Sequence, residues 1–228
     1  MTPGPPPALL PHVPASRPTR RFVILLGGEL SPSSRLGAQL AGASAIAADS
    51  GMAHAAALGL EPILWMGDFD SSDDALIRAH PDIPRATFPA DKNMTDGELA
   101  VAEAVKRGAD EIVLAGAFGG PRADHAFLHL TLALRLAEGG TSTLLTSGTQ
   151  EGRPLLPGSW AEFDYSPGTV FSVLGFSELS ALSIEGVRWP LDRVVVPFGS
   201  SLTLSNRVAT RLRIRLERGK ALLLAHPL

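Results

Sequence analysis

The chain has 228 residues, a formal net charge of −3 and no cysteine. Without cysteine, disulfides, thiolate zinc sites and a cysteine nucleophile are excluded, and the small net charge gives no basic surface for nucleic acid. The 45% hydrophobic and 19% charged fractions are typical of a globular, core-forming protein. No apolar run approaches the ~20 residues of a membrane span, and the N-terminus lacks the pattern of a secretory signal. We therefore expect a cytoplasmic protein with no membrane or nucleic-acid partner.

Residues 1–20 form a low-complexity segment with prolines at positions 3, 5, 6, 7, 11, 14 and 18. Such a segment cannot bury enough apolar surface to offset the entropy lost on ordering. The composition therefore predicts a disordered tail.

Apolar runs alternate with helical patterns between residues 21 and 147. Strands are expected at 21–26, 43–48, 62–66, 85–88, 111–117 and 143–146. Helices are expected at 35–41, 52–60, 73–80 and 95–107, and a fifth ends near Glu138. This alternation predicts an α/β domain with a doubly wound, mostly parallel sheet.

Gly or Asp residues follow four of these strands, at 27–28, 49–51, 67–70 and 116–124. Ligands bind at the carboxyl ends of strands in open α/β sheets. Asp68 and Asp70 are two residues apart, so in an extended segment they point the same way. Two such carboxylates favour a divalent cation, and Mg²⁺ takes one or two carboxylates plus substrate phosphates. The alternative is a turn in which Asp70 or Ser71 caps the next helix.

The polar residues near these strand ends form one candidate site. Its members are Asp49, Asp68, Asp70, Asp91, Asp96, Asp124, Lys92, Asn93, Thr95, Arg122 and His125. Several carboxylates with one or two cations suit Mg²⁺-dependent phosphoryl chemistry, in which the protein positions a polyphosphate and neutralises developing charge. Gly119 and Gly120 precede a helix N-terminus, where backbone N–H groups can approach an anion.

Structural explanations exist for several of these residues. Thr95 and Asp96 stand where a helix needs a cap and a first-turn acid. His125 and His129 are four residues apart, as in a zinc pair, but no third ligand accompanies them at a familiar spacing. No Walker motif and no dinucleotide-binding glycine motif is present.

Helical patterns end near residue 148, and short runs separated by turn residues follow. Strands are expected at 161–165, 169–175, 179–184, 193–196, 201–205 and 212–216. We place a domain boundary there, between an α/β domain at 21–147 and a smaller all-β, sandwich-like domain at 148–228.

The motifs taken together resemble those of the thiamine pyrophosphokinase family over about residues 21–225. They are Asp49-Ser50-Gly51, Gly67-Asp68-Phe69-Asp70-Ser71, Asp91-Lys92-Asn93-Met94-Thr95-Asp96, Gly119-Gly120-Pro121-Arg122-Ala123-Asp124-His125, Gly186-Val187-Arg188-Trp189-Pro190-Leu191 and Ser205-Asn206. The resemblance implies transfer of pyrophosphate from ATP to thiamine, giving thiamine diphosphate and AMP. It also implies Mg²⁺, an ATP-binding catalytic domain, a β-domain for thiamine binding and dimerisation, and a homodimer with thiamine between subunits.

The resemblance also implies roles for individual residues. Asp68, Asp70 and Asp96 correspond to acids that hold the metal, with Asp70, Asp96 and Arg122 in catalysis. The residues implied on the ATP side are Asp49, Asn93, Thr95, Arg122, Asp124 and His125. Those implied around thiamine are Trp189, Ser205 and Asn206, although a tryptophan in a β-domain is more often part of the core. The chain departs from the family pattern at Pro121, Asn93 and His129.

Two other functions are compatible with the same residues. One is a pyrophosphokinase of the same architecture that acts on a hydroxymethyl pterin. The other is a non-catalytic protein that binds thiamine diphosphate or a nucleotide, although a binder has little use for so many carboxylates near phosphates.

Overall fold

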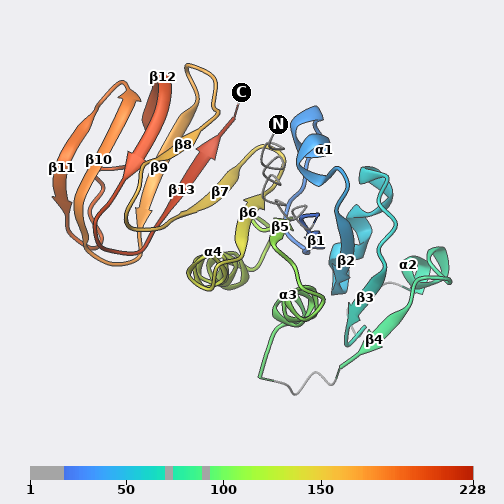
Figure 1. The fold of residues 1–228 in the computed structure, drawn as a ribbon. Helices are drawn as coiled ribbons and strands as arrows, with labels where there is room; N and C mark the ends of the chain where they lie inside the picture. Colours follow the sequence, from blue (N-terminus) through green and yellow to red (C-terminus); the bar gives the residue numbers. More distant parts are fainter. Residues whose placement is uncertain (1–17, 70–73, 89–92, 228) are drawn as a thin grey trace, which may run out of the picture.

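A computed structural model describes residues 18–69, 74–88 and 93–227. The first part of the chain forms six parallel strands in the order β6-β5-β1-β2-β3-β4 (Figure 1). Their bounds are β1 Arg21–Leu25, β2 Ser44–Ala48, β3 Leu64–Gly67, β4 Arg85–Thr87, β5 Glu111–Ala115 and β6 Ser142–Thr146. The sequence therefore predicted all six strands of the parallel sheet.

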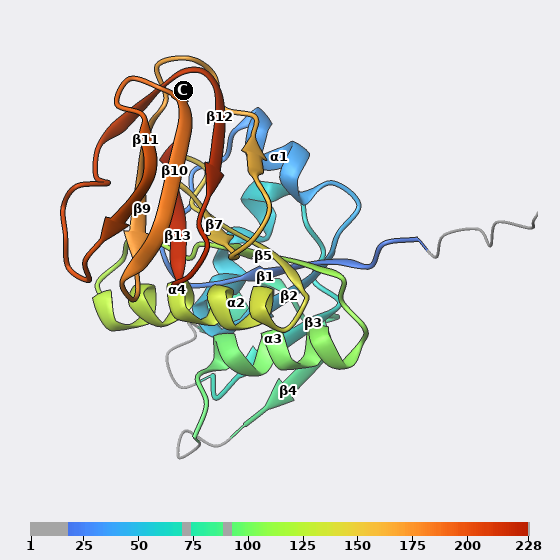
Figure 2. The ribbon, with the colours of Figure 1, turned by 60° about the vertical axis from the view of Figure 1, so that its left-hand side comes forward.

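Helical segments cover both faces of this sheet, which confirms the doubly wound architecture. One face carries α3 Asp96–Lys106 and α4 Ala123–Glu138, which lie side by side (Figure 2). The other carries α1 Ser34–Leu40, η1 Asp49–His54, η2 Ala56–Leu58 and α2 Asp74–Ala79. The predicted helix at 52–60 is thus two short 3₁₀ segments, the second of which ends at Gly59 in a left-handed conformation.

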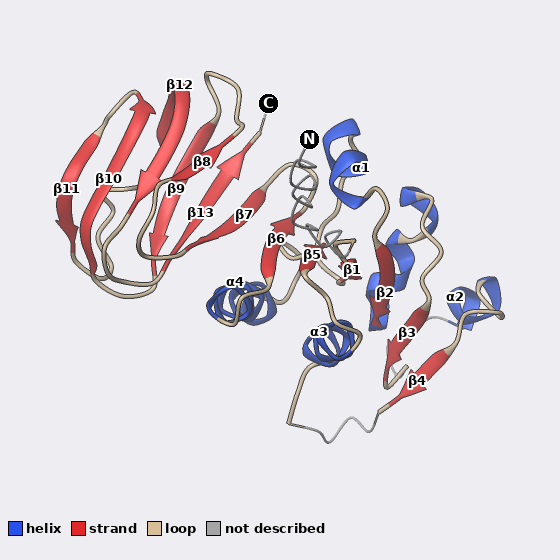
Figure 3. Cartoon of the chain, in the orientation of Figure 1, coloured by secondary structure: helices blue, strands red, loops and turns tan. Residues whose placement is uncertain are grey.

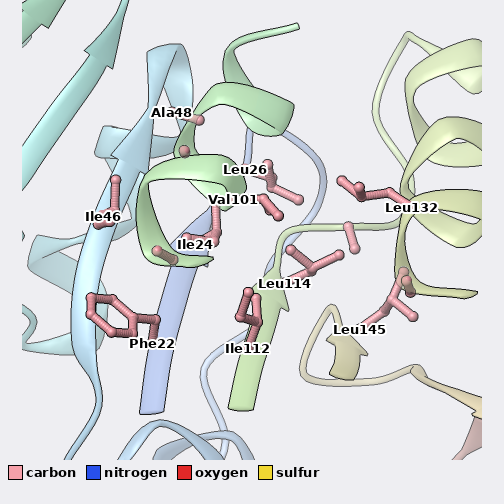
Figure 4. Close-up of a cluster of buried hydrophobic side chains, with 14 of the residues drawn as sticks. Phe22, Ile24, Leu26, Ile46, Ala48, Val101, Ile112, Leu114, Leu132 and Leu145 are labelled. Carbon is pink, nitrogen blue, oxygen red and sulfur yellow. The ribbon is translucent and has the colours of Figure 1, made fainter. Parts of the chain in front are cut away.

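Alternate residues of β1 explain how the sheet is buried on both sides. Ile24 packs with Val101 and Leu132 beneath α3 and α4 (Figure 4). Its neighbour Val23 belongs to the cluster that α1 covers. Successive side chains of a strand point to opposite faces, so a continuous apolar run is required where both faces are covered.

The second part of the chain contains only strands and connecting turns among its described residues (Figure 3). These strands are β7 Glu151–Leu155, β8 Ala161–Phe163, β9 Val170–Gly175, β10 Leu179–Val187, β11 Leu191–Val196, β12 Asn206–Arg215 and β13 Ala221–His226. They enclose their own core, which includes Phe171, Leu182 and Leu212. The predicted all-β domain is confirmed.

Strand β12 connects the two layers of this sandwich. Its first residues, Asn206 and Arg207, pair with β9, whereas Leu212–Ile214 pair with β8. Strand β10 pairs with β12 on the same layer as β8, with a register shift between Glu185 and Val187. A strand that changes partners in this way closes the corner of a two-layer β-structure.

One predicted strand in this part is wrong, and two strands were missed. The segment 201–205 is a turn rather than a strand, because the Leu204 N–H donates to the Ser201 carbonyl. Strands β7 and β13 were not predicted, yet β13 lies between β7 and β9 in the sheet. The boundary near residue 148 stays a prediction.

The parallel and antiparallel strands belong to one hydrogen-bonded sheet. Strand β7 pairs antiparallel with β6, with Leu145 opposite Gly152 and Thr146 opposite Glu151. Within the described residues, no helix is long and apolar enough to cross a membrane.

Candidate active site

A cavity of about 670 Å³ opens at the carboxyl ends of β1, β2, β3 and β5. The segments after these strands line it, together with the first turns of α3 and α4. Seven of the eleven residues of the candidate site line it: Asp49, Asp68, Asn93, Thr95, Asp96, Arg122 and His125. The sheet therefore brings together side chains that are up to 76 residues apart in the chain (His125 minus Asp49).

Backbone segments cross closely at the floor of this cavity. The Gly28 N–H donates to the Gly116 carbonyl at 3.0 Å. A Cβ atom on Gly28 would lie 2.4 Å from that carbonyl oxygen, and one on Gly116 would lie 2.4 Å from the Leu26 carbonyl oxygen. Only glycine permits such an approach, so the two strand ends form one continuous floor.

Asp49 and Asp68 form the acidic wall of the cavity. Asp49 has a φ of 43°, which is uncommon for a residue with a side chain. The Trp65 indole N–H holds it there by donating to the Asp49 carbonyl at 2.9 Å. Asp68 follows β3 directly and is half-buried. A strained conformation that the surrounding structure maintains is common at functional sites.

The first turn of α3 supplies the next group of polar atoms. The Thr95 hydroxyl accepts from the Glu98 N–H at 3.2 Å, and the Glu98 carboxylate accepts from the Thr95 N–H at 3.2 Å. This is the predicted capping box. Because Thr95 and Asp96 also line the cavity, their capping role does not exclude the ligand-binding role, which stays a prediction.

The loop before α4 forms the opposite wall. Gly119 and Gly120 both have positive φ, at 68° and 80°. Arg122 makes a two-pronged ion pair with Asp124, at 3.0 and 2.7 Å, and both side chains are exposed. The Arg122 guanidinium holds the pKa of Asp124 well below its usual range. Asp124 itself does not line the cavity. Its side chain is instead paired with Arg122.

The remaining predicted residues are either outside the described part of the chain or away from this cavity. Asp70, Asp91 and Lys92 lie outside the described residues. Trp189, Ser205 and Asn206 belong to the β-domain and do not line the cavity. Within the described ranges, no group of three or more His, Cys, Asp or Glu side chains is arranged to hold a metal ion.

Asn206 supports Trp189 through the backbone. Its buried amide accepts from the Trp189 N–H at 3.3 Å and donates to the Trp189 carbonyl at 2.8 Å. The Trp189 side chain is 52% exposed, with the Arg188 guanidinium 4.7 Å from its ring centroid. Trp189 is therefore not a core residue, and Asn206 fixes the turn that presents it.

Two polar side chains of residues that line the cavity were not assigned to it from the sequence. Glu98 had the pattern of a capping residue, and His129 was considered only for a zinc pair. His129 is 7% exposed, and its Nδ1 lies 3.1 Å from the Ala117 carbonyl oxygen. The signal for both was helical spacing, since each lies on the cavity side of its helix, one turn from a predicted residue.

Two family models match this chain. The one described as "Thiamin pyrophosphokinase, catalytic domain" matches residues 40–145, and "Thiamin pyrophosphokinase, vitamin B1 binding domain" matches residues 162–221. The chain belongs to the thiamine pyrophosphokinase family. The two matched regions correspond to the parallel α/β part and the β-sandwich.

Individual members of the thiamine pyrophosphokinase family are similar along most of the chain. Thiamine pyrophosphokinase of Bacillus subtilis (strain 168) is 27% identical over 168 residues, which are 72% of this chain and 77% of that protein. A crystal structure of thiamin pyrophosphokinase from Geobacillus thermodenitrificans is 25% identical, with a TM-score of 0.75, covering 91% of this chain and 97% of that one. The yeast thiamin pyrophosphokinase structure has a TM-score of 0.71 at 12% identity, covering 93% and 88%. This last similarity concerns the fold.

Proposed function

We propose that the protein transfers the pyrophosphoryl group of ATP to the hydroxyl of thiamine, giving thiamine diphosphate and AMP. The observation that carries this proposal is the single cavity that Asp49, Asp68 and Asp96 line together with a glycine-rich loop and Arg122. The family matches support the same reaction. They lend no support to the pterin pyrophosphokinase or to the non-catalytic binding protein.

The acids that line the cavity fit Mg²⁺ as the cofactor. Carboxylate oxygens are hard ligands, and Mg²⁺ is usually bound by one or two carboxylates, with waters and substrate phosphates completing the octahedron. Asp68 and Asp96, which line the cavity, would hold the ion. Asp70 is included as a third ligand because of its position in the sequence, two residues after Asp68. Bound there, Mg²⁺ neutralises charge on the polyphosphate.

The loop at Gly119 and Gly120 would bind the polyphosphate. Both glycines have positive φ, and their backbone N–H groups can approach an anion closely. The N-terminus of the 16-residue helix α4 also favours an anion. Arg122 would exchange its exposed pairing with Asp124 for a two-pronged contact with a phosphate. In the reaction, a bond forms between the thiamine oxygen and the β-phosphorus, and the bond from that phosphorus to the bridging oxygen of the α-phosphate breaks. AMP leaves with the bridging oxygen, and the hydroxyl proton passes to water.

We also propose that thiamine lies between two subunits of a homodimer. Trp189, Val195, Phe198, Leu202 and Leu204 are between 46% and 72% exposed on the β-domain. A contiguous patch of exposed apolar side chains marks an interaction site, and we propose that these five form one. A second copy would cover them, and the Trp189 ring would stack against the cationic thiazolium of thiamine, with Ser205 beside it.

The test is purified protein with thiamine, ATP and Mg²⁺, assayed for AMP and thiamine diphosphate in equal amounts. A hydroxymethyl pterin serves as the competing acceptor in a parallel assay. Binding of ATP or thiamine without AMP release at high protein concentration would show a binding protein and refute the proposal. AMP release with the pterin alone would replace thiamine as the acceptor.

A further inference from the structure

His129 is a buried polar residue that lines the proposed ATP cavity. Its Nδ1 contacts the Ala117 carbonyl, but its other ring nitrogen, Nε2, has no protein partner among the described residues. His129 lies on α4, one helical turn after His125, and the two rings meet edge to face with centroids 6.5 Å apart. Buried polar atoms in proteins are nearly always hydrogen-bonded. Because His129 lines the cavity, a ring nitrogen without a protein partner is available to a ligand there.

The contact with Ala117 determines which nitrogen carries the proton. Nδ1 lies 3.1 Å from the Ala117 carbonyl oxygen, and a carbonyl oxygen can only accept. Nδ1 is therefore the protonated nitrogen, and in a neutral ring Nε2 carries a lone pair. Burial lowers the pKa of His129, in agreement with a neutral ring at physiological pH.

The position of Nε2 places this lone pair beside the start of α3. A Cβ atom on Gly97 would lie 3.7 Å from Nε2 and 2.9 Å from the Leu26 side chain. Gly97 therefore leaves the ring edge open between the two helices. An acceptor at this point repels phosphate oxygens, which carry no proton, and attracts N–H or O–H groups.

We infer that His129 is a binding residue that accepts a hydrogen bond through Nε2 from the nucleoside part of ATP, and thereby selects for a donor on the sugar or the base. This inference rests on the proposed use of ATP and deepens it. The donor chemistry has two sources, a ribose hydroxyl and the exocyclic amino group of adenine. The phosphates would lie at the Gly119–Gly120 loop, where backbone N–H groups favour an anion.

The test measures Mg²⁺-dependent binding by calorimetry, without thiamine, for parent protein and His129→Phe. The probes are ATP, 2′-deoxy-ATP, 3′-deoxy-ATP, purine riboside triphosphate (which lacks the amino group) and inorganic tripolyphosphate. Losing one hydrogen bond should weaken ATP binding about fivefold to tenfold in the variant. Tripolyphosphate should bind both proteins equally. The control is Phe127→Leu, because Phe127 lies on the same helix but outside the cavity and is 60% exposed. This variant should change neither the affinity for ATP nor that for tripolyphosphate.

The analogues identify the donor. The parent should bind one of the three modified nucleotides less tightly than ATP, and that difference should vanish in His129→Phe. Equal weakening of ATP and tripolyphosphate, or unchanged ATP binding, would overturn the inference and leave the proposed function intact. A parent protein that does not bind ATP would refute the proposed function and the inference with it.

A second measurement covers the case in which His129→Phe does not fold. Nitrogen NMR of the parent distinguishes a protonated from an unprotonated ring nitrogen. The Nε2 resonance of His129 should be that of an unprotonated nitrogen, and it should move on addition of ATP but not of tripolyphosphate. A protonated Nε2 in the free protein would overturn the inference.

Discussion

Arg35 of α1 and Glu151 of β7 form a two-pronged ion pair between the α/β part and the β-sandwich. The Glu151 side chain is 2% exposed, and Arg35 Nη2 lies 3.0 Å from its Oε2. The carboxylate also accepts from Gln39 at 2.6 Å and from the Tyr165 hydroxyl at 2.9 Å. Burial alone would raise the pKa of Glu151, but Arg35, Tyr165 and Gln39 outweigh it and lower the pKa below its ordinary value.

Arg35→Ala should destabilise the protein strongly, because it leaves the Glu151 carboxylate buried without its cation. Removing one partner of a buried pair costs about 3–5 kcal/mol, and the partial exposure of Arg35 favours the lower end. Urea unfolding measures the change. The control is Lys220→Ala, whose exposed pair with Glu138 also joins the two parts of the chain and should contribute less than about 1 kcal/mol. Equal effects of the two substitutions would contradict this prediction.

The Glu151 network should also make stability depend on acid pH. A carboxyl group with a lowered pKa in the folded state stabilises that state above the unfolded pKa, here near the ordinary value of 4.5. This contribution is lost as the pH falls through the folded value. The difference in unfolding free energy between parent and Glu151→Gln should therefore be largest at neutral pH and shrink toward pH 3. A difference that stays constant over this range would exclude a role for the ionised form.

Asp96→Asn should remove most activity and leave the fold intact. Asp96 lines the cavity at the first turn of α3, where its carboxylate would help to hold Mg²⁺. Loss of one group that supports the electrostatics of the transition state costs about 100-fold or more in turnover. AMP release at saturating ATP and Mg²⁺ measures this loss. Glu103→Gln, on the same helix but paired with Arg107 at the surface, should retain parental turnover. Near-normal activity of Asp96→Asn would show that its role is only that of a first-turn acid.

Gly28→Ala and Gly37→Ala should change stability in opposite directions. A Cβ at position 28 would collide with the carbonyl oxygens of Gly116 and Phe118, at 2.4 and 2.5 Å. The floor of the cavity must then move, at a cost of about 1–3 kcal/mol or more. Gly37 lies within α1 with nothing within 4 Å of a Cβ, so alanine should stabilise it by about 0.5–1 kcal/mol. Thermal unfolding measures the stability of both variants relative to the parent. A Gly28→Ala variant as stable as the parent would show that the cavity floor can adjust.

Trp189→Ala should raise the KM for thiamine and leave the KM for ATP unchanged. Loss of a stacked aromatic ring against a cation weakens binding by about 1–2 kcal/mol, which is roughly tenfold. The matched variant is Trp160→Ala, whose ring contacts Arg213 and Arg215 in the same domain. It should alter stability without changing the KM for thiamine. A common effect of both variants would indicate disturbed folding of the sandwich.

The sequence predicted the parallel sheet well because its central strands are apolar on both faces and four of its strands are followed by Gly or Asp. Strand β7 was missed because it contains Gly152, Arg153 and Pro154 and buries the charged Glu151. Its place comes from partners on both sides, β6 and β13, which no local pattern reveals. The turn at 201–205 has the alternation of a strand, yet Leu202 and Leu204 are the exposed members.

The site was predictable to the extent that it follows from strand ends. Asp49, Asp68 and Asp96 meet in one cavity because parallel strands end at one edge of the sheet. The pairing of Arg122 with Asp124 and the support of Trp189 by Asn206 depend on side-chain geometry that spacing does not carry. His129 is a further case, since its tautomer depends on the position of the Ala117 carbonyl oxygen.

The β6–β7 pairing means that the two halves are not exchangeable modules. Cutting the chain between Thr146 and Glu151 and separating the pieces would strip partners from both strands. Each piece would then present a row of unpaired backbone N–H and C=O groups, which invites pairing with other chains. We expect either half, expressed alone, to aggregate, whereas both halves produced together should reassemble through the same strands.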